Sequence, residues 1–306
     1  MNTQIKLAII AIGIIIPLTS VVISQTSSHI QYTVFENSKF HVVSSSNFLH
    51  EFSQIIGKEK IDSTLLIPEG VDPHDWEPTI KETERLHSSD LIVINGIGYE
   101  HWIDSFDSST YRGIIVDTSN GILDNRDDYD SHDDSDLHSN LDPHIWLNPV
   151  YAKSQVQNMA NAFSNNDPDN EKYYQSNAAA YIKELELLDS KIRNDLSGCK
   201  TNFITFHNAF SYFAEEYNLT QHTIISSNDS HGEVTLKTLE NVIITAKKFN
   251  IKIIFAEENT DIKTSQVIAD EIGGKVLVLS PLEIVSNENY ISKMTQNLEN
   301  LKEALC

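Results

Sequence analysis

The sequence predicts an α/β protein with two similar lobes, each built on a mostly parallel sheet, joined by one long rigid helix. Short apolar runs alternate with helical patterns up to about residue 116, and the same alternation restarts after residue 198. Between these two regions, nothing in 168–196 breaks a helix. Alternating strands and helices are typical of parallel sheets covered on both faces, with the functional site at the carboxyl ends of the strands.

The first half contains four short apolar runs that end at turn residues, which is the pattern of buried strands. We predict strands at 40–44, 63–67, 90–95 and 113–116. Helical spacing of apolar residues predicts helices between them at 48–56, 79–87 and 101–106. The second strand leads into a loop, 68–78, that contains three prolines and one glycine.

The long helical pattern follows a turn at 165–168, where Pro168 stands at a favourable first helical position. It is preceded by a helix that opens at Pro149 and runs to about Phe163. The long stretch has about 29 residues, or about 44 Å at 1.5 Å per residue. A coiled coil is the alternative, but the apolar residues form one seam without sustained heptads. We therefore expect a strut between two lobes.

The second half repeats the alternation without a strict sequence repeat. We predict strands at 202–206, 223–226, 251–255 and 275–279, and helices at 208–217, 234–249, 261–272 and 287–305. The expected organisation is a signal or anchor with a linker, a first lobe, a connecting helix and a second lobe. The signal or anchor with its linker spans 1–38 and the first lobe 39–166. The connecting helix spans 167–197 and the second lobe 198–306.

The N-terminus carries an apolar run, 7–24, of about the length that spans a membrane. It predicts either a cleaved export signal or a retained anchor, with the anchor slightly favoured. Either way we expect the body of the protein to be extracytoplasmic, membrane-anchored or secreted. In an oxidising compartment Cys199 and Cys306 could pair and pin the C-terminus, which the sequence leaves open.

The 306-residue chain has a formal net charge of -22. This argues against a nucleic-acid partner, whose phosphates require Lys and Arg, and fits a protein that handles cations. The acidity is concentrated in 124–146, which holds eight Asp, three His and no Lys. One interpretation is a flexible metal collector that feeds His144, and the other is a solvated loop. The candidate collector residues are His132, Asp133, Asp134 and His138.

Three histidines stand after predicted strands or in loops at the same expected edge of the two sheets: His74, His144 and His207. Neutral imidazole is a common ligand of zinc, and a fourth ligand would complete a tetrahedron. Three carboxylates at the same edge of the second lobe are candidates for that position: Glu257, Glu258 and Glu283. Ser280 also ends a strand but is a poor ligand.

Four segments together resemble the zinc/manganese-specific solute-binding proteins of ABC importers (cluster A-I, zinc-binding branch). They are VDPHDWEPT (71–79), DPHIWLNP (142–149), TFHNAFSYFAEEYNL (205–219) and KVLVLSPLE (275–283). The resemblance covers roughly residue 40 to the C-terminus. It implies two α/β lobes joined by a rigid long helix, with the metal held between them.

The resemblance also implies the ligands. His74, His144 and His207 match the first three, and a His in the third position favours zinc over manganese, because manganese-preferring members commonly carry a carboxylate there. Many members have Asp where Ser280 stands. Some zinc members use a Glu in a similar turn, which implies Glu283 as the fourth ligand, with water and then Glu257 as alternatives.

Other side chains could support the ligands. Asp75, Glu77 and Asp142 could orient imidazoles or serve only in turns and caps. Trp76 and Trp146 could pack around the site or belong to the ordinary core.

The expected function is extracytoplasmic capture of Zn²⁺, or alternatively Mn²⁺, and its delivery to an ABC permease by a monomer that is not an enzyme. A zinc hydrolase is the rival, with Glu257 or Glu258 as general base, although no HExxH motif is present. A metal-dependent surface adhesin is a third alternative.

Overall fold

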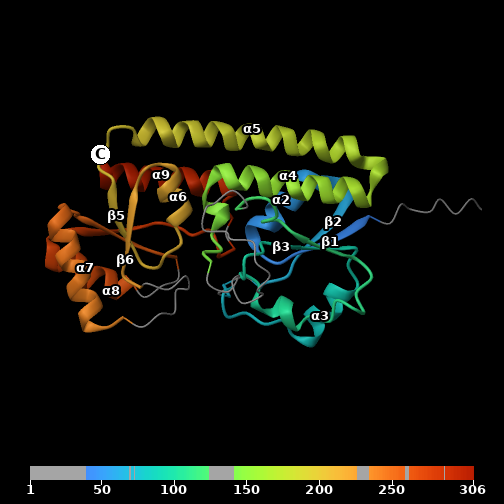
Figure 1. Cartoon of the computed structure of the whole chain (residues 1–306), viewed down its shortest axis with the longest axis horizontal. Coiled ribbons are helices and arrows are strands. Elements are labelled where there is room, and N and C mark those ends of the chain that lie inside the picture. The colour runs from blue at the N-terminus through green and yellow to red at the C-terminus, as the bar shows by residue number, and fades with distance from the viewer. Residues whose placement is uncertain are drawn as a thin grey trace, which may run out of the picture. The chain divides into compact units, whose positions relative to one another are not determined.

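The computed structural model describes residues 39–306 apart from Glu69, Asp72, 124–140, 226–233, 259–261 and Ser286. The described residues form two four-stranded sheets in which every pair of neighbouring strands is parallel (Figure 1). This confirms the predicted α/β class. The expected N-terminal signal or anchor and the four collector residues lie outside the described part of the chain. Within that part, no helix is both long and apolar enough to cross a membrane.

The first sheet has the order β2-β1-β3-β4. Its strands are β1 (Phe40–Ser44), β2 (Ile61–Leu65), β3 (Leu91–Ile94) and β4 (Ile114–Asp117). Strand β2 lies two residues before its predicted position, because its pairing with β1 starts opposite Ile61, and Leu66 and Ile67 are buried beyond the sheet. Helices α2 (Asn47–Gly57) and α3 (Ile80–His87) follow β1 and β2, and the predicted helix at 101–106 is a 3-10 turn, η2 (His101–Ser105).

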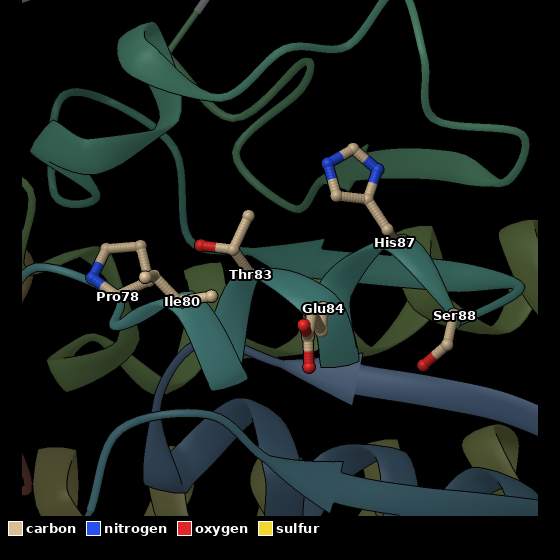
Figure 2. A pocket seen from close by; sticks show the side chains of 6 residues that line it. All are labelled: Pro78, Ile80, Thr83, Glu84, His87 and Ser88. Atoms are coloured by element: carbon tan, nitrogen blue, oxygen red, sulfur yellow. The ribbon is translucent and has the colours of Figure 1, made fainter.

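Helix α3 starts at a capping box formed by Thr79 and Glu82. The Thr79 side chain accepts the backbone N–H of Glu82, and the Glu82 side chain accepts the backbone N–H of Thr79. An open groove of about 500 Å³ lies along this helix (Figure 2). Its lining residues are Pro78, Ile80, Thr83, Glu84, His87 and Ser88. None of them belongs to the predicted metal ligands, so this hollow is separate from the expected site.

The second sheet repeats the arrangement of the first, with the order β6-β5-β7-β8. Its strands are β5 (Asn202–Thr205), β6 (Thr220–Thr223), β7 (Ile253–Ala256) and β8 (Lys275–Val278). Its helices are α6 (Ser211–Glu216), α7 (Leu236–Phe249), α8 (Ile262–Ile272) and α9 (Tyr290–Leu305). Strand β6 lies three residues earlier than predicted, because it pairs in register with β5 from Thr220 onward, and α6 is shorter than expected.

Two long helices follow the first sheet. Asn148 caps α4 (Pro149–Asn166) by accepting the backbone N–H of Val150, and a 3-10 turn, η5 (Pro168–Asn170), leads into α5 (Glu171–Leu196). The buried seam of α5 recurs every three to four residues: Tyr174, Ala178, Tyr181, Leu185, Leu188, Ile192 and Leu196. Helix α5 packs against α4 and α2 and also against α9, so one helix contacts elements from both halves of the chain (Figure 1).

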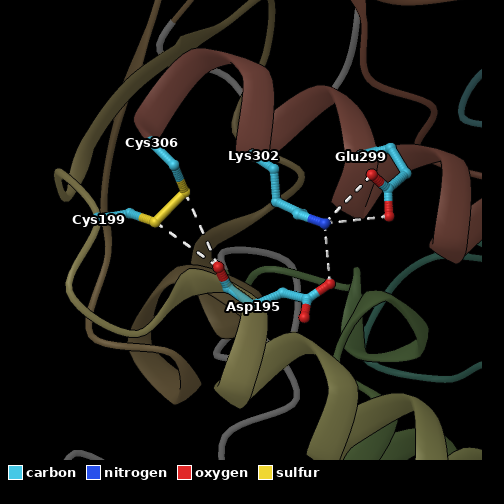
Figure 3. The surroundings of a disulfide bond; sticks show 5 residues. All are labelled: Asp195, Cys199, Glu299, Lys302 and Cys306. Atoms are coloured by element: carbon cyan, nitrogen blue, oxygen red, sulfur yellow. Dashed lines mark hydrogen bonds and ion pairs between the residues drawn. A yellow bond between two sulfur atoms is a disulfide. The ribbon is translucent and has the colours of Figure 1, made fainter.

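A disulfide joins the ends of two helices. Cys199, just after α5, is bonded to Cys306, at the end of α9 (Figure 3). Beside it, the Lys302 ammonium lies 3.1 Å from the Asp195 carboxylate and also pairs with Glu299. The pairing that the sequence left open is therefore present, and it ties the C-terminus to the end of the long helix.

Candidate metal centre

Four side chains from segments far apart in the sequence meet at one point: His74, His144, His207 and Glu283, called here the His–Glu cluster. His74, His207 and Glu283 lie in loops that follow the ends of strands. His144 is the residue just before the 3-10 turn η4 (Ile145–Leu147). Their potential ligand atoms all lie within 4.8 Å of one another, and all four residues are buried. Neither His144 nor His207 exposes any surface.

The distances within the His–Glu cluster suit one small cation. Glu283 Oε1 lies 2.9 Å from His74 Nε2 and 3.1 Å from His144 Nε2. The Nε2 atoms of His144 and His207 are 3.3 Å apart. Around a tetrahedral zinc with bonds of about 2.0–2.1 Å, neighbouring ligand atoms are separated by roughly 3.3 Å. The donor set of three imidazole nitrogens and one carboxylate oxygen is one that zinc commonly takes.

Two of the imidazoles are held from behind by carboxylates. Asp142 Oδ1 accepts both the Nδ1–H of His144, at 2.6 Å, and its backbone N–H, at 3.0 Å. Glu257 Oε1 accepts the Nδ1–H of His207, at 2.7 Å, and its backbone N–H, at 3.0 Å. The Nδ1 side of each ring is thus turned to its carboxylate, and Nε2 is the atom that faces the other cluster members.

Charge within the His–Glu cluster shifts two pKa values. Burial by itself lowers the pKa of His144, but the carboxylates of Asp142 and Glu283 overcome that effect and raise the pKa to about 10. Burial by itself raises the pKa of Glu283, but the charges and hydrogen bonds of His74 and His144 hold it well below its usual range. The metal-free cluster therefore keeps a proton that an arriving cation must displace.

The remaining candidate side chains have separate places. Glu257 lies at the Nδ1 side of His207, not among the atoms facing the centre. Glu258 accepts hydrogen bonds from Ser280 and Lys293. Asp75 and Glu77 are exposed. The supporting role considered for Asp142 agrees with its contact to His144.

The two tryptophans of the motifs differ in position. The Trp146 ring lies 5.0 Å from the His144 ring and stacks on Phe48, so it packs directly behind the site. Trp76 packs edge-on against Trp102 in a separate apolar cluster of the first sheet. Trp146 therefore packs against the site, whereas Trp76 is an ordinary core residue.

A family model described as "Zinc-uptake complex component A periplasmic" matches residues 42–304. The chain is 38% identical over 284 residues to the high-affinity zinc uptake system protein ZnuA of Bacillus subtilis (strain 168), covering 88% of this chain and 89% of the relative. It resembles the Zn(II)-bound ZnuA-like domain of Streptococcus pneumoniae AdcA with a TM-score of 0.73 and 30% identity, over 87% of this chain and 98% of that one.

A third similarity is to the laminin-binding protein Lmb of Streptococcus agalactiae, whose structure is described as a bifunctional protein with adhesin and metal transporting activity. The TM-score is 0.77 and the identity 28%, over 87% of this chain and 99% of that one.

Proposed function

The chain belongs to the family of the periplasmic component A of zinc-uptake complexes, and we propose that it captures Zn²⁺ outside the cytoplasm and delivers it to an ABC-type permease. The observation that carries the proposal is the His–Glu cluster, in which four buried donor atoms lie within 4.8 Å of one another. Because burial of a charged carboxylate is costly unless it is paired, such a cluster is stable only when a cation or a proton balances it.

In this proposal His74, His144 and His207 each give Nε2 to the zinc, and Glu283 gives Oε1. Glu283 thus takes the fourth position, in preference to water or Glu257. Three nitrogen ligands favour zinc over manganese, which prefers oxygen. Asp142 and Glu257 hold the Nδ1 sides of His144 and His207, so that Nε2 is the nitrogen turned toward the metal in both rings.

We further propose that the metal lies between two lobes, 39–166 and 198–306, joined by the helix within 167–197. Contacts that cross this boundary surround the ligands. The indole N–H of Trp146 donates to the Pro281 carbonyl at 2.8 Å, and the Tyr212 hydroxyl donates to the Asp142 carbonyl at 2.8 Å. With a long helix also packed on both halves, we expect little hinge closure, and release through small loop movements. We expect the protein to act as a monomer.

The acidic stretch would serve a different role. We propose that His132, Asp133, Asp134 and His138 bind zinc weakly and raise its concentration near the tight site. Carboxylate and imidazole side chains are both ligands of zinc, so the composition of this stretch favours the binding of additional ions. Deletion of 126–139 tests this role.

A zinc hydrolase is less well supported. Its general base would have to be Glu257 or Glu258, but Glu257 already accepts two hydrogen bonds from His207 and Glu258 pairs with Lys293. We therefore propose a binding protein that is not an enzyme. An additional adhesin role has one supporting observation, the similarity to the bifunctional Lmb structure.

The test is elemental analysis of the purified full chain together with a titration in which zinc and manganese compete. We expect one tightly bound zinc that manganese does not displace at equal concentration. Equal retention of both metals, or no tight equivalent, contradicts the proposal. Metal-dependent turnover of ester or phosphate substrates that Glu257→Gln abolishes would favour the hydrolase instead.

A further inference from the structure

The turn that carries Glu283 has an unusual backbone. It follows β8 and reads Ser280-Pro281-Leu282-Glu283. Leu282 has a φ of +61°, in the left-handed region that side chains other than glycine rarely adopt. Such a conformation persists only when the surrounding structure holds it in place. The direction in which Glu283 leaves the turn therefore depends on what holds Leu282.

Ser280 supplies the most direct restraint on Leu282. Its hydroxyl accepts the backbone N–H of Leu282 at 3.2 Å and donates to Glu258 Oε2 at 2.9 Å. Asn297 from α9 clamps the backbone of Ser280, accepting its N–H at 2.8 Å and donating to its carbonyl at 2.7 Å. The Ser280 hydroxyl thus links the left-handed residue to the Glu258 carboxylate.

Lys293 fixes that carboxylate. It lies on the buried face of α9, its side chain is only 7% exposed, and its ammonium donates to Glu258 Oε1. A buried ammonium without a partner is strongly unfavourable, so this pair is held together. With one carboxylate oxygen on Lys293, the other is directed at Ser280. A chain of contacts therefore runs from Lys293 through Glu258 and Ser280 to the turn of Glu283.

The orientation of Glu283 decides how many oxygens it can offer. In the structure a single atom, Oε1, lies within hydrogen-bond distance of both His74 and His144. One oxygen from the carboxylate gives four-coordination with the three imidazoles, which suits zinc. A carboxylate free to rotate could offer both oxygens and raise the coordination number, which suits manganese better.

We propose that Lys293 is a positioning residue for Glu283 and, through Glu258 and Ser280, a determinant of the preference for zinc over manganese. This inference rests on the proposed zinc-binding function of the His–Glu cluster. Neither Lys293 nor Ser280 is assigned a bond to the metal. Both act by fixing the backbone that aims the fourth ligand.

The test compares full-length variants. Lys293→Met removes the ammonium, and Ser280→Ala removes the hydroxyl without disturbing the ion pair. The matched control is Lys302→Met on the same helix. The Lys302 ammonium pairs with Asp195, which is far in sequence from the turn of Glu283. Measurements are zinc affinity, the ratio of zinc to manganese affinity, and the visible absorption of the cobalt-loaded protein, which is intense for four-coordinate cobalt and weak for higher coordination.

We expect Lys293→Met and Ser280→Ala to lose about 10- to 100-fold in zinc affinity, the range in which the loss of a residue that orients a ligand falls. The zinc-to-manganese ratio should fall and the cobalt absorption weaken, while Lys302→Met matches the wild type. The double variant Glu258→Gln with Lys293→Met should recover most of the lost affinity, because a neutral amide can still accept the Ser280 hydroxyl without an ammonium partner.

Wild-type affinity and wild-type cobalt absorption in both single variants would overturn the inference. A loss of affinity with unchanged absorption and unchanged metal preference would overturn it too, since general loosening of the fold would produce that result. If Lys293→Met does not fold, the zinc affinity, metal preference and cobalt absorption of Ser280→Ala test the inference by themselves. Unchanged zinc affinity in Glu283→Gln would instead overturn the ligand set of the proposed function, so the two failures are distinguishable.

Discussion

Two buried imidazoles in this protein are oriented in the same way by carboxylates from different segments. Asp142 lies two residues before His144, whereas Glu257 follows β7 and reaches His207 across 50 residues of sequence. In both cases one carboxylate oxygen accepts the ring Nδ1–H and the backbone N–H together. The paired acceptor fixes the direction of each ring, so that Nε2 of both imidazoles faces the other members of the His–Glu cluster.

Replacement of one imidazole should abolish tight binding. His207→Ala should lower zinc affinity by more than the roughly 10- to 100-fold that loss of an outer partner costs, because a ligand itself is removed. The variant should stay folded, since three other cluster members and the core remain. Isothermal titration calorimetry measures the affinity. His222→Ala, a histidine on β6 outside the cluster, is the control and should bind like the wild type; equal affinities for the two variants contradict the assignment.

The titration of His144 predicts how pH acts on stability. The pKa of His144 in the folded protein is about 10 and exceeds the usual 6.5. The protonated imidazole therefore stabilises the metal-free fold fully below pH 6.5, and this contribution is lost as pH rises toward 10. Glu283 has a lowered folded pKa, so its contribution is present above the usual 4.5 and is lost as pH falls through the folded value.

Zinc must displace the His144 proton, so its binding should strengthen over the same range of pH. The difference in Tm between zinc-loaded and metal-free protein should therefore widen from pH 6.5 to 9. Differential scanning calorimetry at several pH values checks it. A difference that stays constant over this range would show that no proton is displaced.

At the residue scale the sequence could suggest the three histidines and Asp142 as a partner of one of them, but not the partner of His207. His74 and His207 come soon after predicted strands and His144 lies in a later loop, which is why the sequence predicts that they meet at one edge of the sheets. The contact of Glu257 with His207 and that of Lys293 with Glu258 depend on which strands and helices become neighbours, which no local pattern of residues predicts. A signal for Lys293 existed, because helical spacing from Tyr290 puts it on the same face as apolar residues, where a Lys is unexpected.

Among the elements, α5 and α9 form a pair that the disulfide closes. They pack along each other, and Cys199–Cys306 joins their ends beside the ion pairs of Lys302. A cross-link between residues 107 apart in sequence restricts the unfolded chain strongly. The bond therefore stabilises the attachment of the long helix to the second sheet without contacting the His–Glu cluster.

Removal of the disulfide should affect stability more than binding. Cys199→Ser combined with Cys306→Ser should lower the free energy of unfolding by about 2–4 kcal/mol, as measured by denaturant titration. Zinc affinity should be unchanged, since the cysteines lie at the far ends of helices that do not supply ligands. Wild-type protein treated with reductant is the control and should match the variant. An unchanged free energy of unfolding would contradict the stabilising role.

The acidic stretch is an element whose role can be isolated by deletion. Removing 126–139 should eliminate weak additional zinc equivalents and keep the tight one, because none of the His–Glu cluster residues is removed. Equilibrium dialysis over a range of zinc concentrations counts both classes. Loss of the tight equivalent would show that His132 or His138 is a primary ligand.

Element prediction was most accurate where turn chemistry was unambiguous. β1 has the predicted bounds, and Thr79 and Pro149 mark the starts of α3 and α4 as expected. Strands β2 and β6 were displaced by two and three residues, because both are edge strands whose limits follow from pairing with β1 and β5 rather than from their own apolar residues. Pairing across the sheet is not encoded in a local pattern.

At the scale of the whole molecule, one hydrophobic core joins the two sheets. Phe48 on α2 stacks on Trp146, and the Tyr290 hydroxyl of α9 donates to the Trp146 carbonyl at 2.6 Å. Glu51 of α2 also accepts the backbone N–H of Tyr290, at 2.9 Å. These contacts connect the segment of His144 to the last helix of the chain. The sequence could predict two parallel sheets and a long helix, but not this shared core, which depends on how these elements pack.

The most direct test of the central claim is X-ray diffraction at the zinc absorption edge from crystals of the zinc-loaded full chain. The account predicts one dominant anomalous peak, about 2.0–2.2 Å from the Nε2 atoms of His74, His144 and His207 and from Oε1 of Glu283. A dominant peak elsewhere, or one that lacks any of the three imidazoles, would contradict it.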